Sequence, residues 1–205
     1  TQAPNERPRA PPPPRSPPLP RASFFSGDGC MVVMIEAEDL ALSGDWSVVS
    51  DGDAIGGKYI TWLGLESGKN NRDADEGDVI SASVDIPTPG TYSFKWRMRQ
   101  PDGVDSDKGN DAWLYFPDAD RYGPADTNKA YGGFIKVYGR ATKGAFEYSG
   151  TGEDSNGHTQ IALEFGQAGE YTMEISGRSH GLQIDQILVF GEDLSVDEAA
   201  ANTGC

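Results

Sequence analysis

Short segments in which apolar and polar residues alternate recur along the chain from Met31 onward. In "TYSFKWRMR", Tyr92, Phe94, Trp96 and Met98 share one face, and the serine, lysine and arginines between them share the other. Successive side chains of a strand point to opposite faces of a sheet, so this period of two predicts half-buried β-strands. The same alternation occurs in "DVISASVDI" (78–86), "TQIALEF" (159–165) and "EYTMEIS" (170–176), with turn signals such as "PTPG" and "QAGE" between the segments.

Further strands are predicted at 31–37, 58–63, 112–116, 133–138, 145–149 and 182–190. About nine or ten short strands, with no convincing helix between them, predict an antiparallel β-sandwich. Long connections are expected at 41–58, 64–77, 101–111 and 117–132. Binding sites are usually built on long loops of a rigid sandwich, so these loops are where we expect a site.

Composition narrows the possible functions. The 205 residues suffice for one domain of ordinary size, and a net charge of −15 argues against nucleic-acid binding, which needs basic patches. Such an acidic chain suits salty or extracellular surroundings, or a protein loaded with calcium. No apolar run of 18 or more residues occurs, so no membrane span is expected.

Proline divides the chain into unequal parts. Nine of the 14 prolines fall in the first 20 residues, so residues 1–29 are predicted to form an extended proline-rich linker, with an SH3-type ligand as the alternative. Residues 30–192 would form the sandwich, and residues 193–205 a weakly helical acidic tail. Cys30 and Cys205 flank the domain, where either a disulfide or two free thiols is compatible with the sequence.

Carboxylates interrupt the first and last apolar strands. Glu36 and Glu38 in "VVMIEAEDL" are two residues apart, so their side chains would emerge on the same face of a strand. Asp185 in "LQIDQILVF" supplies a third carboxylate if the first and last strands are neighbours. Oxygen ligands converging in this way favour Ca²⁺. The alternatives are a solvated strand end and a catalytic pair, although a glycosidase pair must flank a bond from opposite sides.

Two further patterns contain residue types that can carry chemistry. The loop "DGVDSDKGND" offers Asp102, Asp105, Asp107, Asn110 and Asp111 for a second calcium, but it lacks the glycine and the final glutamate of an EF-hand. A solvated acidic loop is the alternative. His158 and His180 lie in glycine-flanked loops, and no GxSxG, HExxH or CxxC motif occurs. The sequence therefore does not predict an enzyme.

Aromatic residues outside the alternating strands are candidates for sugar binding, because the C–H face of a sugar ring packs on an aromatic ring. We expect Tyr122 and Tyr131, in the long loop 117–132, to be exposed platforms. Trp46 is a further candidate, whereas Trp62 and Trp113 lie in strand-like segments where a place in the core is favoured over a platform.

The segments "VVMIEAEDL", "GGKYITWLG", "VDIPTPGTYSFKWRMR", "NDAWLYF" and "GRSHGLQIDQILVF" resemble the family-6 and family-35 carbohydrate-binding modules of the galactose-binding-like superfamily. The resemblance covers about residues 31–190. It implies a jelly-roll β-sandwich with a structural calcium held by Glu36, Glu38 and Asp185, and by backbone carbonyls near Gly57. In those modules a polar side chain two positions before the aspartate, typically asparagine, contacts the sugar, and Gln183 stands there in this chain.

The function expected from these observations is a noncatalytic carbohydrate-binding module. It would hold a secreted, extracellular parent protein near a polysaccharide by raising the effective concentration. The expected sugar contacts are Tyr122, Tyr131, Trp46, Trp113, Gln183 and His180, and we expect a monomer. The alternatives are a calcium-stabilised structural or adhesion domain without sugar binding, and a lyase or hydrolase on the same scaffold.

Overall fold

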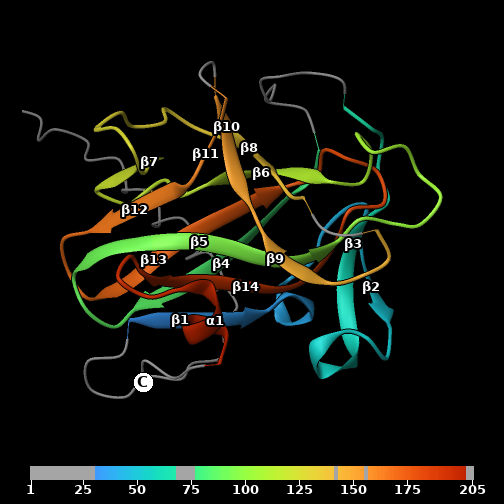
Figure 1. Cartoon of the computed structure of the whole chain (residues 1–205), viewed down its shortest axis with the longest axis horizontal. Coiled ribbons are helices and arrows are strands. Elements are labelled where there is room, and N and C mark those ends of the chain that lie inside the picture. Colours follow the sequence, from blue (N-terminus) through green and yellow to red (C-terminus); the bar gives the residue numbers. More distant parts are fainter. Residues whose placement is uncertain (1–30, 68–76, 141–142, 155–156, 202–205) are drawn as a thin grey trace, which may run out of the picture.

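Two antiparallel sheets pack face to face in the computed structural model, which describes residues 31–67, 77–140, 143–154 and 157–201. The larger sheet is ordered β2 (Trp46–Ser50), β3 (Lys58–Trp62), β14 (Gln183–Gly191), β5 (Gly90–Arg99), β12 (Ile161–Phe165) and β7 (Arg121–Pro124), with β1 (Val32–Glu36) beside β14 and β9 (Glu147–Ser149) beside β5 (Figure 1). The smaller sheet is ordered β11 (Gly157–Thr159), β10 (Thr151–Asp154), β8 (Ile135–Tyr138), β6 (Asp111–Tyr115), β13 (Gly169–Ser176) and β4 (Val79–Ile86). The predicted antiparallel β-sandwich is confirmed.

The core lies between the sheets and consists of the inward faces of the alternating strands. The four apolar residues of β5, Tyr92, Phe94, Trp96 and Met98, are all fully buried, as the alternation predicted. Burying a large apolar side chain of this kind contributes about 1.5–3 kcal/mol, so the shared core dominates the stability of the sandwich.

Four strands lie in segments that the sequence did not predict as strands. β2 falls in the expected loop 41–58 and β7 in the expected loop 117–132, while β10 and β11 form a hairpin at the edge of the smaller sheet. β2, β7 and β11 are edge strands with one neighbour each. Edge strands bury less apolar surface, so their hydrophobic alternation is weak, and β7 even contains glycine and proline.

The C-terminal residues pack on the sandwich as far as Ala200, in place of the acidic tail expected from Asp193. Helix α1 (Val196–Ala200) begins with a capping box between Ser195 and Glu198. Its Ala199 is fully buried in a second apolar cluster, which includes Val32, Leu188 and Phe190 on the outer side of β1 and β14. The structured domain therefore includes this helix.

We predict that a chain ending at Asp193 is less stable than one ending at Ala201. Removing α1 exposes Leu188 and Phe190, which should cost at least about 2 kcal/mol of unfolding free energy. Thermal denaturation of the two truncated chains measures the difference. Equal melting temperatures would show that α1 contributes no stabilising contact.

Two sequence-based expectations concern residues outside the described ranges. They are the proline-rich linker 1–29, and the pairing or separation of Cys30 and Cys205. Among the described residues, no helix has the length and apolar character needed to cross a membrane.

Candidate functional site

A β-bulge in β14 turns Asp185 toward the outer face of the larger sheet. β14 pairs with β5 through Ile184 and Met98, and then through Gln186 and Arg97, so Asp185 is the extra residue. Ile184 and Ile187 both face the core although they are three residues apart, which places Asp185 and Gln186 together on the outer side. A bulge of one residue changes the phase of the alternation in this way.

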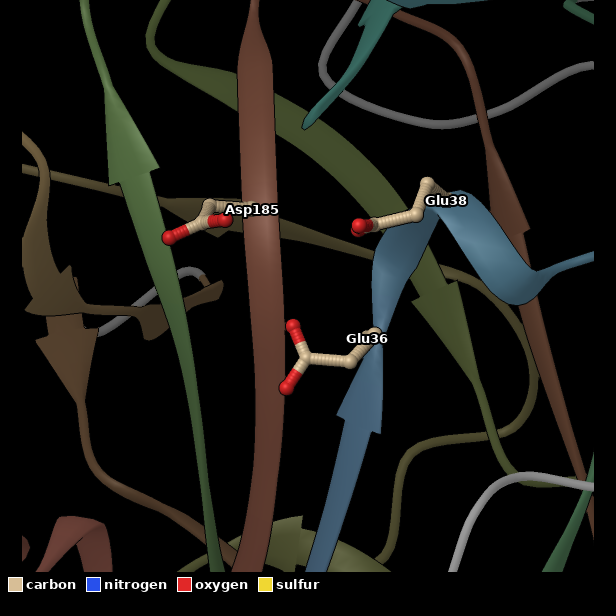
Figure 2. Close-up of side chains that lie close together, drawn as sticks. All are labelled: Glu36, Glu38 and Asp185. Atoms are coloured by element: carbon tan, nitrogen blue, oxygen red, sulfur yellow. The ribbon is translucent and has the colours of Figure 1, made fainter. Parts of the chain in front are cut away.

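The three predicted carboxylates converge beside this bulge (Figure 2). Glu36, Glu38 and Asp185 each offer an oxygen, and these atoms lie within 4.8 Å of one another. β1 pairs with β14, with Glu36 opposite Gln186, so the first and last strands are neighbours as the prediction required. The expectation that both glutamates lie on one strand is wrong. β1 ends at Glu36, and Glu38 lies in the 3₁₀ turn Ala37–Asp39.

One oxygen of each carboxylate is buried and has no hydrogen-bond donor. These orphaned atoms are Glu36 Oε2, Glu38 Oε2 and Asp185 Oδ1. The other oxygen of Asp185 accepts from Arg97 Nη1 and from the backbone N–H of Ile55 at 3.2 Å. The other oxygen of Glu36 accepts from Gln186 Nε2 at 2.6 Å. Buried carboxylate oxygens without a donor are costly unless a cation compensates them.

The electrostatics of the cluster also favour a cation. Burial raises the pKa of Glu36, Glu38 and Asp185 above the ordinary value of a carboxyl group. Neighbouring carboxylates raise the pKa of Glu36 and Glu38 further. For Asp185, the hydrogen bond from Arg97 opposes this rise. A divalent cation would offset the cost of burying the carboxylate charges and the repulsion between them. A set of ligands that are all oxygen atoms suits Ca²⁺. The residues present therefore fit a calcium ion.

The loop before β3 forms one wall of the cluster and approaches it with bare backbone. Gly56 has a φ of +72°, and a Cβ at this position would lie 2.9 Å from Glu38 Oε1. A side chain there would push against the carboxylate and would also strain the backbone. Glycine at position 56 therefore keeps the space beside Glu38 open.

The acidic loop 102–111 does not gather into a second centre. Among the described residues, the only group of three or more potential metal ligands is the cluster of Glu36, Glu38 and Asp185. Asp111 instead accepts two hydrogen bonds from Arg178 Nη1, at 2.5 and 2.6 Å, and both side chains are buried. Asp111 would therefore have to give up its ion pair with a buried arginine in order to bind a cation.

Three of the predicted aromatic platforms are buried. Tyr122 is 3% exposed, and its hydroxyl donates to the carbonyl of Leu114 inside the core. Trp46 and Trp113 are also buried. Their proposed role as exposed sugar platforms is wrong, because each ring faces protein on both sides. Tyr131 is half-buried and meets the ring of Tyr122 edge-on, with 5.1 Å between ring centroids.

The remaining two predicted sugar contacts, Gln183 and His180, have different hydrogen-bond partners. Gln183 accepts from Arg99 Nε at 2.5 Å on the outer face of the larger sheet. His180 is exposed at a loop end, where its Nδ1 lies 2.8 Å from the carbonyl oxygen of Gly64. It lines a cavity of about 410 Å³ with Glu66, Val104 and Lys108. Neither Tyr131 nor Gln183 lines this cavity.

A cavity of about 350 Å³ opens beside the edge of the smaller sheet formed by β8, β10 and β11. It is lined by Glu66, Ser67, Asp107, Lys108, Asn110, Asp111, Lys136, Tyr138, Glu153, His158 and Arg178. The rings of Tyr138 and His158 pack together with centroids 4.8 Å apart. Glu66 and Lys108 also line the His180 cavity, so the two hollows adjoin.

Sequence reasoning missed most of this cavity. Its signal was the outward half of β8, where Lys136 and Tyr138 alternate with the buried Ile135 and Val137. An aromatic residue on an outward position of a short strand is a possible platform, but β10 and β11, which complete the surface, were not predicted. From the sequence, His158 is only a histidine in a glycine-flanked loop.

Comparisons with known proteins give matches only among solved structures, since no protein-family model matches the sequence and no curated protein matches it significantly. A carbohydrate-binding module of Cellvibrio mixtus lichenase 5A, in complex with cellotriose, is 18% identical with a TM-score of 0.46. The match covers 78% of this chain and 97% of that chain.

Two further modules match over the same share of this chain. The C-terminal family-6 module of a Zobellia galactanivorans laminarinase is 16% identical with a TM-score of 0.46, and the match covers 98% of it. A family-35 module from Clostridium thermocellum is 15% identical with a TM-score of 0.45, also over 98% of its length. The chain is thus similar in structure to modules of both families that its sequence resembles.

Proposed function

We propose that the protein is a noncatalytic carbohydrate-binding module that carries a structural calcium and tethers a secreted parent protein to a polysaccharide. The observation that carries the glycan assignment is the cavity of about 350 Å³, which combines two rings in tilted contact with a dense set of hydrogen-bonding side chains. Its volume lies at the lower end of the range of about 300–1,000 Å³ that is usual for ligand pockets in proteins.

Tyr138 and His158 supply the surface for a sugar ring in this cavity. Tyr138 is half-buried and His158 exposed, so the pair presents a ring at the protein surface. The C–H face of a sugar would pack on this pair. Sugar hydroxyls would find partners in Lys136, Glu153 and Asn110, which line the same space.

The charges of the cavity favour a neutral glycan. Each of its three cations has a carboxylate partner: Lys136 with Glu153, Arg178 with Asp111, and Lys108 with Glu66. Asp107 adds one more acidic side chain, so the lining carries one excess negative charge with His158 neutral. A uronate or sulfate would meet no uncompensated cation among these residues, in a chain whose net charge is −15.

The same pairing argues against glycosidase chemistry at this position. Hydrolysis of a glycosidic bond needs one carboxyl group as proton donor and a second carboxylate across the bond. Burial raises the pKa of Asp111, but the ion pair with Arg178 stabilises its negative charge and opposes that rise. Its side chain is only 3% exposed. Asp111 is therefore poorly placed to protonate a leaving group.

The calcium would act on stability rather than on the sugar. It would occupy the space that the three orphaned oxygens face, and would tie β1 and its following turn to β14. Because a calcium ion binds the folded state preferentially, it stabilises the sandwich by mass action.

The test of the proposed function is a glycan array probed with the full chain, with and without calcium. We expect binding to neutral oligosaccharides and none to uronate-rich or sulfated ones. Tyr138→Ala should weaken the binding at least about tenfold, since one sugar–aromatic contact contributes about 1.5 kcal/mol. Tyr138→Phe, which keeps the ring, is the matched control and should bind nearly as wild type.

Absence of binding to every glycan would favour the alternative, a calcium-stabilised structural or adhesion domain. Turnover of a polysaccharide would contradict the noncatalytic assignment. Wild-type affinity in Tyr138→Ala would show that the sugar lies elsewhere, with the adjoining cavity of His180 as the next position to test.

A further inference from the structure

Strand β9 contacts the carboxylate cluster through side chains that are not among its proposed ligands. It pairs with β5 alongside Trp96, Arg97 and Met98, and its Tyr148 reaches the outer face of the larger sheet. The Tyr148 hydroxyl donates to Gln186 Oε1, and Gln186 Nε2 donates to Glu36 Oε1. A chain of two hydrogen bonds thus runs from β9 to a proposed calcium ligand.

The two hydrogen bonds can run in only one direction, from Tyr148 to Gln186 and from Gln186 to Glu36. A carboxylate accepts hydrogen bonds only, so the amide of Gln186 must turn its NH₂ group toward Glu36. The amide oxygen then faces Tyr148 and needs a donor, which the phenol provides. Gln186 is 3% exposed, so water does not readily replace either partner. Tyr148 therefore fixes the orientation of the amide, and the amide fixes which oxygen of Glu36 is engaged.

Glu36 and Asp185 each keep one carboxylate oxygen that accepts no hydrogen bond. Glu36 Oε1 accepts from Gln186, and Glu36 Oε2 is buried without a donor. The same division holds at Asp185, where Arg97 occupies Oδ2 and leaves Oδ1 without a donor. Arg97 in turn lies over the ring of Phe146, the residue before β9, at 5.0 Å from its centroid.

We infer that Tyr148 and Gln186 are positioning residues for the metal centre, and that they hold Glu36 as a ligand through one oxygen. This inference rests on the calcium site of the proposed function. Partners beyond the ligands typically change metal affinity by about 10–100-fold. Without the hydrogen bonds from Tyr148 through Gln186, the carboxylate of Glu36 can rotate. It would then no longer be held in the orientation that binds the ion.

The test measures calcium affinity by titration calorimetry on the full chain. Tyr148→Phe removes one hydroxyl and should weaken the affinity about tenfold. Tyr171→Phe is the matched control, because its hydroxyl donates only to the backbone carbonyl of Gln167, and its affinity should equal that of the wild type. Gln186→Met should weaken the affinity at least as much, and adding Tyr148→Phe to it should have no further effect.

A double-mutant cycle separates positioning from general stability. In a Glu36→Gln background the ligand charge is gone, so Tyr148→Phe should leave the remaining calcium affinity unchanged. The infrared carboxylate bands of the calcium-bound protein should shift in Tyr148→Phe and not in Tyr171→Phe. Wild-type affinity in both Tyr148→Phe and Gln186→Met, or an equal loss in the Glu36→Gln background, would overturn the inference while leaving the calcium site intact. A wild-type chain that binds no calcium would overturn the metal centre itself.

Discussion

Replacing Arg178 with methionine should destabilise the domain by about 3–5 kcal/mol, because it leaves Asp111 as an unpaired charge in a buried position. Arg178 also lies over the ring of Trp113, 5.4 Å from its centroid, so its side chain contributes packing as well as charge. For a domain of this size we expect the melting temperature to fall by roughly 6–20 °C. Thermal denaturation at pH 7 measures the change.

A second substitution provides the control. Asp111→Asn in the Arg178→Met background removes the stranded charge and should restore a large part of the loss. The single variant should also regain stability at low pH, since Asp111 can then bind a proton. Burial already raises the pKa of Asp111 in the wild type, and loss of Arg178 removes the main opposing influence. If Arg178→Met melts as the wild type does, the pair contributes no net stability.

Chelation of calcium should lower the melting temperature by roughly 5–10 °C relative to protein with excess calcium. At about 100 times the dissociation constant, a ligand of the folded state adds about 2.7 kcal/mol, and each kcal/mol corresponds to roughly 2–4 °C here. Calcium should restore stability better than magnesium, which requires a tighter octahedron. Scanning calorimetry in EDTA, calcium and magnesium makes the comparison.

Variants of the ligands test whether the response comes from this cluster. Glu38→Gln and Asp185→Asn should each remove most of the calcium response, while Asp39→Asn, in the same turn but exposed, should retain it. Identical melting of the wild type in EDTA and in millimolar calcium would show that the three carboxylates hold no metal.

The calcium response should also diminish as the pH falls. The folded-state pKa values of Glu36, Glu38 and Asp185 are raised, so the metal-free fold binds more protons than the unfolded chain. The contribution of these three groups to the stability of the metal-free fold is therefore greatest below their pKa values in the unfolded chain. It decreases as the pH rises through their pKa values in the folded state. Calcium requires the deprotonated forms, so its stabilising effect should be larger at pH 7 than at pH 5. An equal effect at both values would contradict these carboxylates as ligands.

The sequence predicted the convergence of the three carboxylates, but it misplaced most of the aromatic residues, for a physical reason. Carboxylates in apolar strands are conspicuous, because burial of an uncompensated charge is expensive. Glu36, Glu38 and Asp185 could therefore be singled out without a structure. Aromatic residues give no such contrast. Tyr122 lies in a segment with glycine and proline that resembles a loop in the sequence. In the structure it lies in strand β7, and its side chain packs in the core.

The hydrophobic alternation by itself determined the strands of the core, the antiparallel sandwich and the carboxylates at its first and last strands. These are local consequences of which faces must leave water. The tertiary structure alone decided which polar side chains meet. The bulge at Asp185, the hydrogen bonds from Tyr148 through Gln186 to Glu36, and the gathering of Tyr138, His158 and Arg178 all depend on contacts between segments that are far apart in the sequence. Outward side chains contribute little apolar burial, so their positions follow from strand pairing and register, which the alternation does not specify.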